Sequence, residues 1–181
     1  MAMKLITTNP DSTDVATVSF TSGIDSTYKL YIFKFININP ATDREALTFN
    51  GSIDGGSNYN VNDSTTFFQA EHDESNAGTA ISYQTGSDHA LVAEFASLTE
   101  SDAGGSYDAD HGSSGTLWLF NPAGTTYYKH FYSTFNTTSY DDTSQHSFVA
   151  GYFKTASAIN AIQFKSNSGN MDGIIKMYGV G

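Results

Sequence analysis

Short apolar runs, separated by stretches of Gly, Ser, Thr, Asn and Asp, recur along the whole chain. The runs are rich in Phe, Tyr, Ile, Val and Thr, which suit a pleated, half-buried surface. This spacing is typical of an all-β protein, in which strands alternate with polar turns. We therefore predict strands at Val15–Phe20, Tyr28–Ile38, Ala46–Ile53, Thr66–Ala70, Ala80–Tyr83, Gly115–Asn121, Tyr127–Thr134, His146–Phe153, Ile159–Lys165 and Ile174–Val180.

So many short strands in 181 residues favour one domain, spanning residues 1–181, over two. We predict a single β-sandwich, jelly-roll-like, with at most one short helix. The helix candidate is His89–Leu98, where apolar residues recur at three- and four-residue steps, and a short strand is the alternative. Two polar, Gly-rich loops are expected at Asp54–Thr65 and Thr99–Ser114, and the second is long enough to be either functional or mobile.

The run Tyr28–Ile38 is apolar on both of its alternating faces. Such a strand is covered on both faces, or it uses one of them as an interface. The face that carries Tyr31, Phe33 and Phe35 provides our candidates for core or interface residues.

Alternation in two later runs makes sharper predictions. Trp118 lies between Leu117 and Leu119, so we expect it on the opposite, exposed face. In the last run Ile175 and Met177 share one face and Lys176 and Tyr178 the other, and Gly179 is expected to permit a turn.

Charge and cysteine content exclude several classes of partner and site. Acidic residues outnumber Lys and Arg by 19 to 8, for a net charge of −11, and no basic cluster is present. Nucleic acid and anionic membranes are therefore not expected as partners. The absence of Cys excludes disulfides and zinc–thiolate sites. No apolar stretch of about 18 residues could form a membrane-spanning helix, and the first residues do not resemble a secretory signal, so we expect assembly in a cytoplasm.

Motifs of catalysis are absent from the sequence. No nucleophile elbow, phosphate-binding Gly loop or zinc-protease motif occurs. Glu71, Asp73 and Glu74 crowd together after a predicted strand, where a solvated loop explains them better than a glycosidase site. Asp108 and Asp110 are weak candidates for a cation site, since oxygen-rich loops also serve as ordinary turns. We expect no catalytic residue, no bound metal and no cofactor.

Aromatic residues are the main compositional excess, with 13 Phe, 11 Tyr and 1 Trp. A sandwich core and a subunit interface account for most of them. A carbohydrate-binding platform built on Trp118, Tyr127 and Tyr128 is the alternative, and it would make the chain a host receptor-binding module.

Several stretches of the second half form a recognisable set: Gly115–Pro122, Thr125–Phe131, Phe148–Tyr152, Ser157–Phe164, Ser168–Asn170 and Gly173–Gly179, with Thr65–Phe68 in the first half. With these stretches the chain resembles a family of short virion structural proteins of tailed bacteriophages, many from marine hosts. Members of that family end in a similar Gly-x-Ile-Lys-Leu-Tyr-Gly pattern, from which Met177 is a mild departure.

This resemblance implies a non-enzymatic β-sandwich on the virion surface, assembled after synthesis in the host cytoplasm. The expected role is that of a capsid decoration (cement) protein or of a tail or fibre component. The expected partners are its own copies, in a homo-oligomer such as a trimer, and other virion proteins of the capsid or tail.

Overall fold

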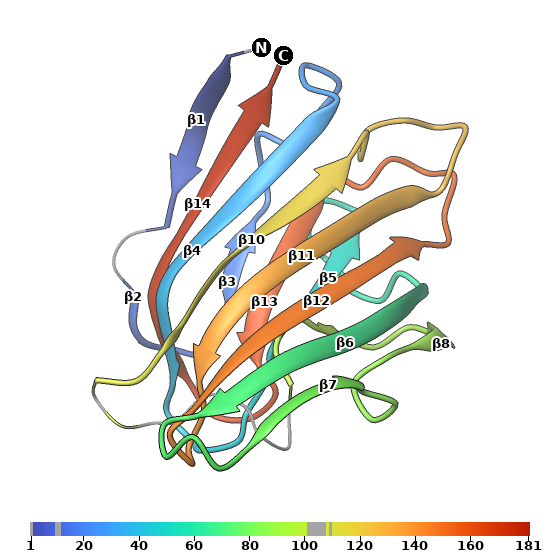
Figure 1. Ribbon diagram of the computed structural model, residues 1–181. Coiled ribbons are helices and arrows are strands. Elements are labelled where there is room, and N and C mark those ends of the chain that lie inside the picture. Colours follow the sequence, from blue (N-terminus) through green and yellow to red (C-terminus); the bar gives the residue numbers. More distant parts are fainter. Residues whose placement is uncertain (1, 10–11, 101–107, 109) are drawn as a thin grey trace.

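The computed structural model describes residues 2–9, 12–100, 108 and 110–181, and these form an all-β sandwich without any helix (Figure 1). No described segment could therefore cross a membrane as a helix. The strands are β1 (Met3–Thr8), β2 (Ser12–Val15), β3 (Val18–Phe20), β4 (Leu30–Pro40), β5 (Leu47–Ser52), β6 (Asp63–Asp73), β7 (Thr79–Tyr83), β8 (Ala90–Val92), β9 (Ala96–Ser97), β10 (Ser113–Phe120), β11 (Lys129–Thr138), β12 (Thr143–Phe153), β13 (Ala161–Ser166) and β14 (Met171–Val180).

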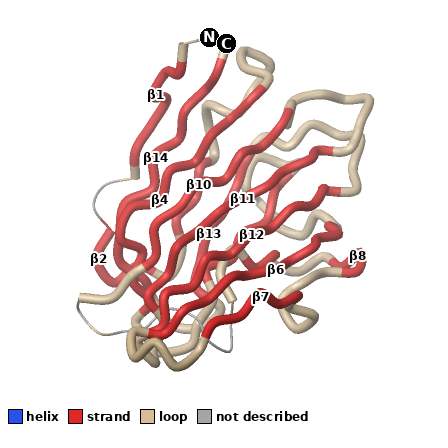
Figure 2. Tube along the Cα trace, in the orientation of Figure 1, coloured by secondary structure: helices blue, strands red, loops and turns tan. Residues whose placement is uncertain are grey.

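Two antiparallel sheets of unequal size make up the sandwich (Figure 2). The large sheet has ten strands in the order β1-β14-β4-β10-β11-β12-β6-β7, with β2 added to β14 and β8 to β6. The small sheet has the order β3-β13-β5-β9. The chain crosses repeatedly from one sheet to the other, as in jelly-roll-like sandwiches. The small sheet packs on one face of the large sheet, and no second layer of the described residues covers the other face.

Phenylalanine rings fill the space between the sheets. Phe164 of β13 lies near the centre, with its ring 5.3 Å from Phe33 and 5.0 Å from Phe35 of β4, and 6.1 Å from Phe49 of β5. Tyr31, Phe33 and Phe35 are all buried in this core. The sequence candidates on β4 therefore lie between the two sheets of one chain, not on its outer surface.

A β-bulge in β4 corrects one expectation from the alternation. Simple alternation places Ile36 and Ile38 on the same face, but the register with β14 shifts after Ile36. Asn37 adopts a left-handed backbone with φ of 50°, so Ile38 turns into the core while Ile36 remains exposed.

The predicted helix at His89–Leu98 is wrong, and the short strand is correct. This segment holds β8, which pairs with β6, and β9, which pairs with β5. Leu91 has φ of 61°, which no right-handed helix accommodates. Hydrogen bonds to two strands of different sheets replace those of the expected helix.

Two further details differ from the sequence prediction. The edge strand β1 was not predicted, because its exposed residues give little alternation.

Gly179 does not form a turn: it lies within β14, where an added Cβ would stand 2.2 Å from a ring carbon of Tyr28. The glycine therefore allows the Tyr28 ring to pack directly on the strand.

Candidate functional site: the open face of the large sheet

Apolar side chains form a continuous row across the open face of the large sheet. Cross-strand pairing links Leu5 of β1 to Tyr178 of β14, Tyr178 to Ile32 of β4, and Ile32 to Trp118 of β10. Trp118 in turn pairs with Tyr132 of β11. On β4, β10 and β11 the residues before and after them are buried on the core side, because side chains alternate along a strand. The row thus spans five neighbouring strands on a face that no second layer covers.

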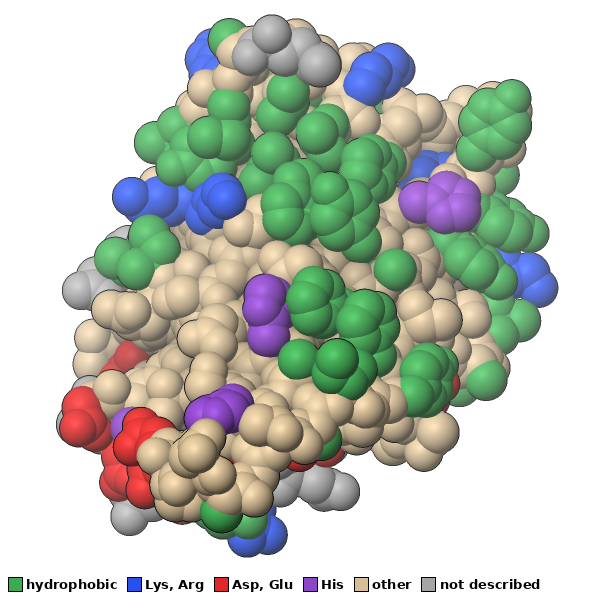
Figure 3. All heavy atoms as spheres, viewed as in Figure 1, with side chains coloured by type: hydrophobic (Ala, Val, Ile, Leu, Met, Phe, Trp, Pro, Cys, Tyr) green, Lys and Arg blue, Asp and Glu red, His purple; other side chains and the backbone are tan. Residues whose placement is uncertain are grey.

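We call this row, with two neighbours from the next row, the outer patch. Four of its members keep large fractions of their surface accessible: 52% for Met3, 49% for Leu5, 41% for Tyr132 and 37% for Phe120. Trp118 and Tyr178 are half-buried, and Ile32 in the middle of the row is only 9% exposed. Figure 3 shows hydrophobic side chains gathered over the upper part of this face, whereas acidic side chains gather at its lower left end. The outer patch consists of Met3, Leu5, Ile32, Trp118, Phe120, Tyr132 and Tyr178.

Aromatic rings stack within the outer patch. Trp118 and Tyr132 lie 4.5 Å apart at 23°, and Phe120 stacks on Tyr132 at 5.6 Å. The ammonium of Lys34 lies 5.9 Å from the Trp118 ring and donates a hydrogen bond to the Thr116 hydroxyl. Trp118 therefore stands on the face opposite the buried Leu117 and Leu119, as alternation predicted.

A second aromatic stack lies on the same face near the β7 edge. Phe68 of β6 and Phe148 of β12 are register partners whose rings lie 4.8 Å apart at 8°. His146 stacks on Phe148 at 4.3 Å. Next to them Ile81 of β7 is 80% exposed, the highest value among the large apolar side chains.

The three proposed sugar-platform residues do not stack on one another. Trp118 belongs to the outer patch, whereas Tyr128 stacks on Tyr152 of β12 at 5.6 Å. Tyr127 is 75% exposed. Between the two stacks runs a groove of about 360 Å³, with lining residues that include Phe120, Tyr132, His130, Tyr152 and Ala150.

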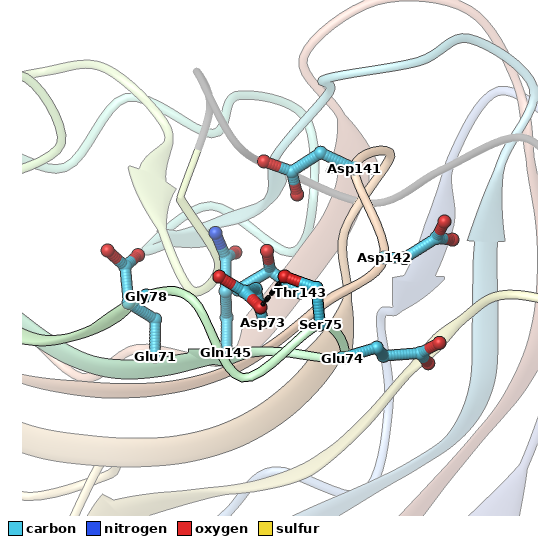
Figure 4. Close-up of a pocket in the computed structure, with 9 residues that line it drawn as sticks. All are labelled: Glu71, Asp73, Glu74, Ser75, Gly78, Asp141, Asp142, Thr143 and Gln145. Atoms are coloured by element: carbon cyan, nitrogen blue, oxygen red, sulfur yellow. Dashed lines mark hydrogen bonds between the residues drawn. The ribbon is translucent and has the colours of Figure 1, made fainter.

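The acidic residues noted in the sequence line an open hollow of about 820 Å³ at one end of the molecule (Figure 4). Glu71 and Asp73 belong to the end of β6, not to a loop after it. Asp73 accepts hydrogen bonds from the Ser75 hydroxyl and the Ala77 N–H, and these lower its pKa below 3.8. In Figure 4 the carboxylates of Glu74 and Asp142 point away from that of Glu71. Glu74 and Asp142 are therefore not directed at the same point of the hollow as Glu71.

The cation candidates Asp108 and Asp110 lie close to Asn39 and His111. The backbone carbonyl of Asp108 accepts hydrogen bonds from the Asn39 side chain and from the His111 N–H. Asp110 is exposed. Within the described ranges, no three His, Asp or Glu side chains are grouped closely enough to share a metal ion.

A buried ion pair at the start of β6 was not foreseen from the sequence. The Nδ1 atom of His89 lies 2.6 Å from a carboxylate oxygen of Asp63, which is fully buried. The Asp63 hydrogen bond raises the pKa of His89 above 6.5, and burial raises the pKa of Asp63 above 3.8. The pair is separated by 26 residues, so no local pattern could reveal it.

The surroundings of this pair indicate a structural role. The His89 N–H donates to the Thr65 hydroxyl, and the His89 carbonyl accepts from the Thr65 N–H and the Ser64 hydroxyl. The contacts fasten the segment before β8 onto β6.

Comparison with protein-family models, with curated proteins and with solved structures found no match for this chain.

Proposed function

We propose that the chain is a non-enzymatic structural protein of a bacteriophage virion that assembles through the outer patch. The observation that carries the proposal is the continuous row of apolar side chains on the uncovered face of the large sheet. Contiguous apolar patches on the surface of soluble proteins typically mark protein–protein contacts. Trp and Tyr, which Trp118, Tyr132 and Tyr178 provide, are frequent anchors of such contacts.

The charges beside the outer patch support a protein partner. Lys34 and Lys176 are register partners on neighbouring strands of the open face. Like charges placed directly opposite each other destabilise a sheet. A partner surface that carries carboxylates would relieve this repulsion, and the chain itself, with a net charge of −11, offers such surfaces.

The role that fits is mechanical. A rigid sandwich buries its outer patch against copies of itself or against a capsid or tail protein, and each Å² of apolar surface removed from water contributes about 25 cal/mol before ordering costs. Many copies on one particle then bind strongly through multivalency. Decoration of the capsid and a place in the tail or fibre both fit this arrangement, with the protein at the virion surface.

Sedimentation velocity and binding to particles that lack the chain test the proposal together. We expect the wild-type chain to form oligomers and to bind such particles. The double variant Leu5→Glu/Tyr132→Glu should lose particle binding and every oligomer that forms through the outer patch, because it places carboxylates within that patch. Ile53→Glu is the matched control, since Ile53 is also exposed, at 47%, but follows β5 of the small sheet. A monomeric wild-type chain that does not bind particles would refute the proposal.

A second candidate function is carbohydrate binding, and the groove between the two aromatic stacks favours it. Aromatic rings line the groove, and hydroxyls of Ser64 and Thr66 lie among its other lining residues. Ala150 is an exposed residue of the groove, so Ala150→Phe fills it from the open face. A glycan array should then show hits for the wild type that the variant loses, and an array without any hit excludes this candidate.

A further inference from the structure

We propose that β7 is a self-pairing edge, at which two copies of this chain join their large sheets into one continuous antiparallel sheet. β7 is the last strand of the large sheet, and Figure 1 shows no strand beyond it. The proposal concerns a surface separate from the outer patch and does not depend on it.

The hydrogen bonds of β7 leave one side of its backbone unpaired. Gln84 donates its N–H to Phe67, and the carbonyl of Gly78 accepts from Asp73, so the even-numbered residues face β6. Backbone groups alternate in direction along an antiparallel strand. The N–H and C=O groups of Thr79, Ile81 and Tyr83 therefore point away from β6, and no described residue hydrogen-bonds them.

The β7 edge lacks the features that normally keep sheet edges apart. Its sequence, Thr-Ala-Ile-Ser-Tyr, contains no charge, proline or glycine. Ile81 is also the most exposed large apolar side chain. The opposite edge differs, because β1 carries Lys4 and a bulge between Leu5 and Thr7. Charges and bulges are the usual protection of an edge strand, and an unprotected apolar edge recruits another strand.

The free groups of β7 are placed symmetrically about Ile81, so the same strand of a second copy can pair with all of them. If two β7 strands pair antiparallel about a twofold axis at Ile81, Ile81 faces Ile81 of the second copy and Thr79 faces Tyr83. These residues all direct their N–H and C=O groups toward the partner, so each facing pair exchanges two hydrogen bonds. The contact is isologous and closes as a dimer. The two Ile81 side chains meet on the open face, beside the Phe68–Phe148 stack.

Disulfide trapping tests this register directly, since the chain contains no Cys. Ile81→Cys should cross-link to itself on mild oxidation, because facing residues of a hydrogen-bonded pair lie about 5.5 Å apart at Cα, within disulfide range. Thr79→Cys is the matched control: it lies on the same strand and face, but the two introduced thiols would stand about 13 Å apart. The double variant Thr79→Cys/Tyr83→Cys should cross-link again.

Sedimentation in the absence of oxidant gives the second readout. Ile81→Lys should weaken dimerisation about tenfold or more, because two like charges would face each other. Ile81→Pro should also weaken it while leaving the β6–β7 ladder intact, since the lost N–H points away from β6. Three results would overturn the proposal: a dimer that survives both substitutions, equal cross-linking of Ile81→Cys and Thr79→Cys, or a wild-type chain without dimers. The outer-patch variant Leu5→Glu/Tyr132→Glu should retain this dimer, which separates the two proposals.

Discussion

Aromatic rings pack differently on the two faces of the large sheet. In the core, rings of β4 meet Phe164 of the small sheet edge to face, at 63° for Phe33 and 83° for Phe35. Phe49 and Phe164, which are register partners within the small sheet, lie at 20°. On the open face rings lie nearly parallel, at 8° for Phe68–Phe148 and 10° for Tyr128–Tyr152. The difference follows from the number of layers that supply the rings.

Two layers interdigitate in the core, so a ring from one sheet inserts between rings of the other and meets them at an angle. On the open face each ring stands beside its register partner in the same sheet, and the two lie side by side. The ring faces that stacking does not cover remain in contact with water. The core rings are therefore already removed from water within one chain. The rings of the open face would be removed from water only by a partner.

Removal of a core ring should have the largest effect on stability. We expect Phe164→Ala to lower the free energy of unfolding by about 3–5 kcal/mol, because Phe164 is fully buried among four other Phe rings. Urea denaturation followed by tryptophan fluorescence measures this change. A loss below about 1 kcal/mol would mean that a core ring contributes no more to the free energy of unfolding than a ring on the open face.

Breaking the buried ion pair should have the next largest effect. His89→Ala leaves the carboxylate of Asp63 buried without a partner, which costs about 3 kcal/mol or more. The double variant His89→Ala/Asp63→Ala is the control, and it should recover part of this loss. Equal stability of the single and double variants would contradict the assignment of a buried charge.

The same pair should make stability depend on pH. The pKa of His89 is raised above its ordinary value of 6.5 in the folded chain, so protonation favours folding. This contribution is complete below pH 6.5 and is lost as the pH rises through the raised pKa. As the pH rises from 6.5, the denaturation midpoint of the wild type should fall. In His89→Gln the part of this fall that His89 causes should be absent.

An open-face ring should matter far less to the isolated chain. We expect Tyr132→Ala to change the stability of the monomer by less than about 1 kcal/mol, because no second layer opposes that ring. The same substitution should weaken association in sedimentation experiments. A large loss of monomer stability would show that stacking on the open face contributes to folding as the core does.

The smallest effect is expected at a buried hydroxyl on the inner face. The Oγ atom of Ser133 is buried and has no hydrogen-bond partner in the described part of the chain. Ser133→Ala removes this unsatisfied group, so we expect unchanged stability or a gain of about 1 kcal/mol. Thermal melts of both proteins decide the sign, and a clear loss would reveal a partner for the hydroxyl.

Sequence patterns predicted the sandwich and the strands that bury one face. Strict alternation in β14 placed Ile175 and Met177 on one face and Lys176 and Tyr178 on the other, and in the structure the first two are buried and the other two half-buried. Such strands are readable because burial on one side imposes a period of two. The open face itself was not predicted, because alternation does not reveal whether a second layer covers the outward side.

Other features depend on contacts between distant residues. The segment around Leu91 has helical spacing, yet its hydrogen bonds to β6 and β5 hold it as two short strands. The bulge at Asn37 and the Asp63–His89 pair likewise arise only when separate strands meet. Local propensity carries no information about such encounters.

The pairing of β1 with β14 places Met3 opposite Val180, so the two ends of the chain emerge side by side (Figure 1). A short Gly/Ser linker could therefore join them, and new ends could be opened in the turn at residues 54–58, where the backbone is exposed. A circularly permuted chain should keep the sandwich and would carry any fused peptide at the turn of residues 54–58. Such a permutant could display peptides without any change to either face of the large sheet.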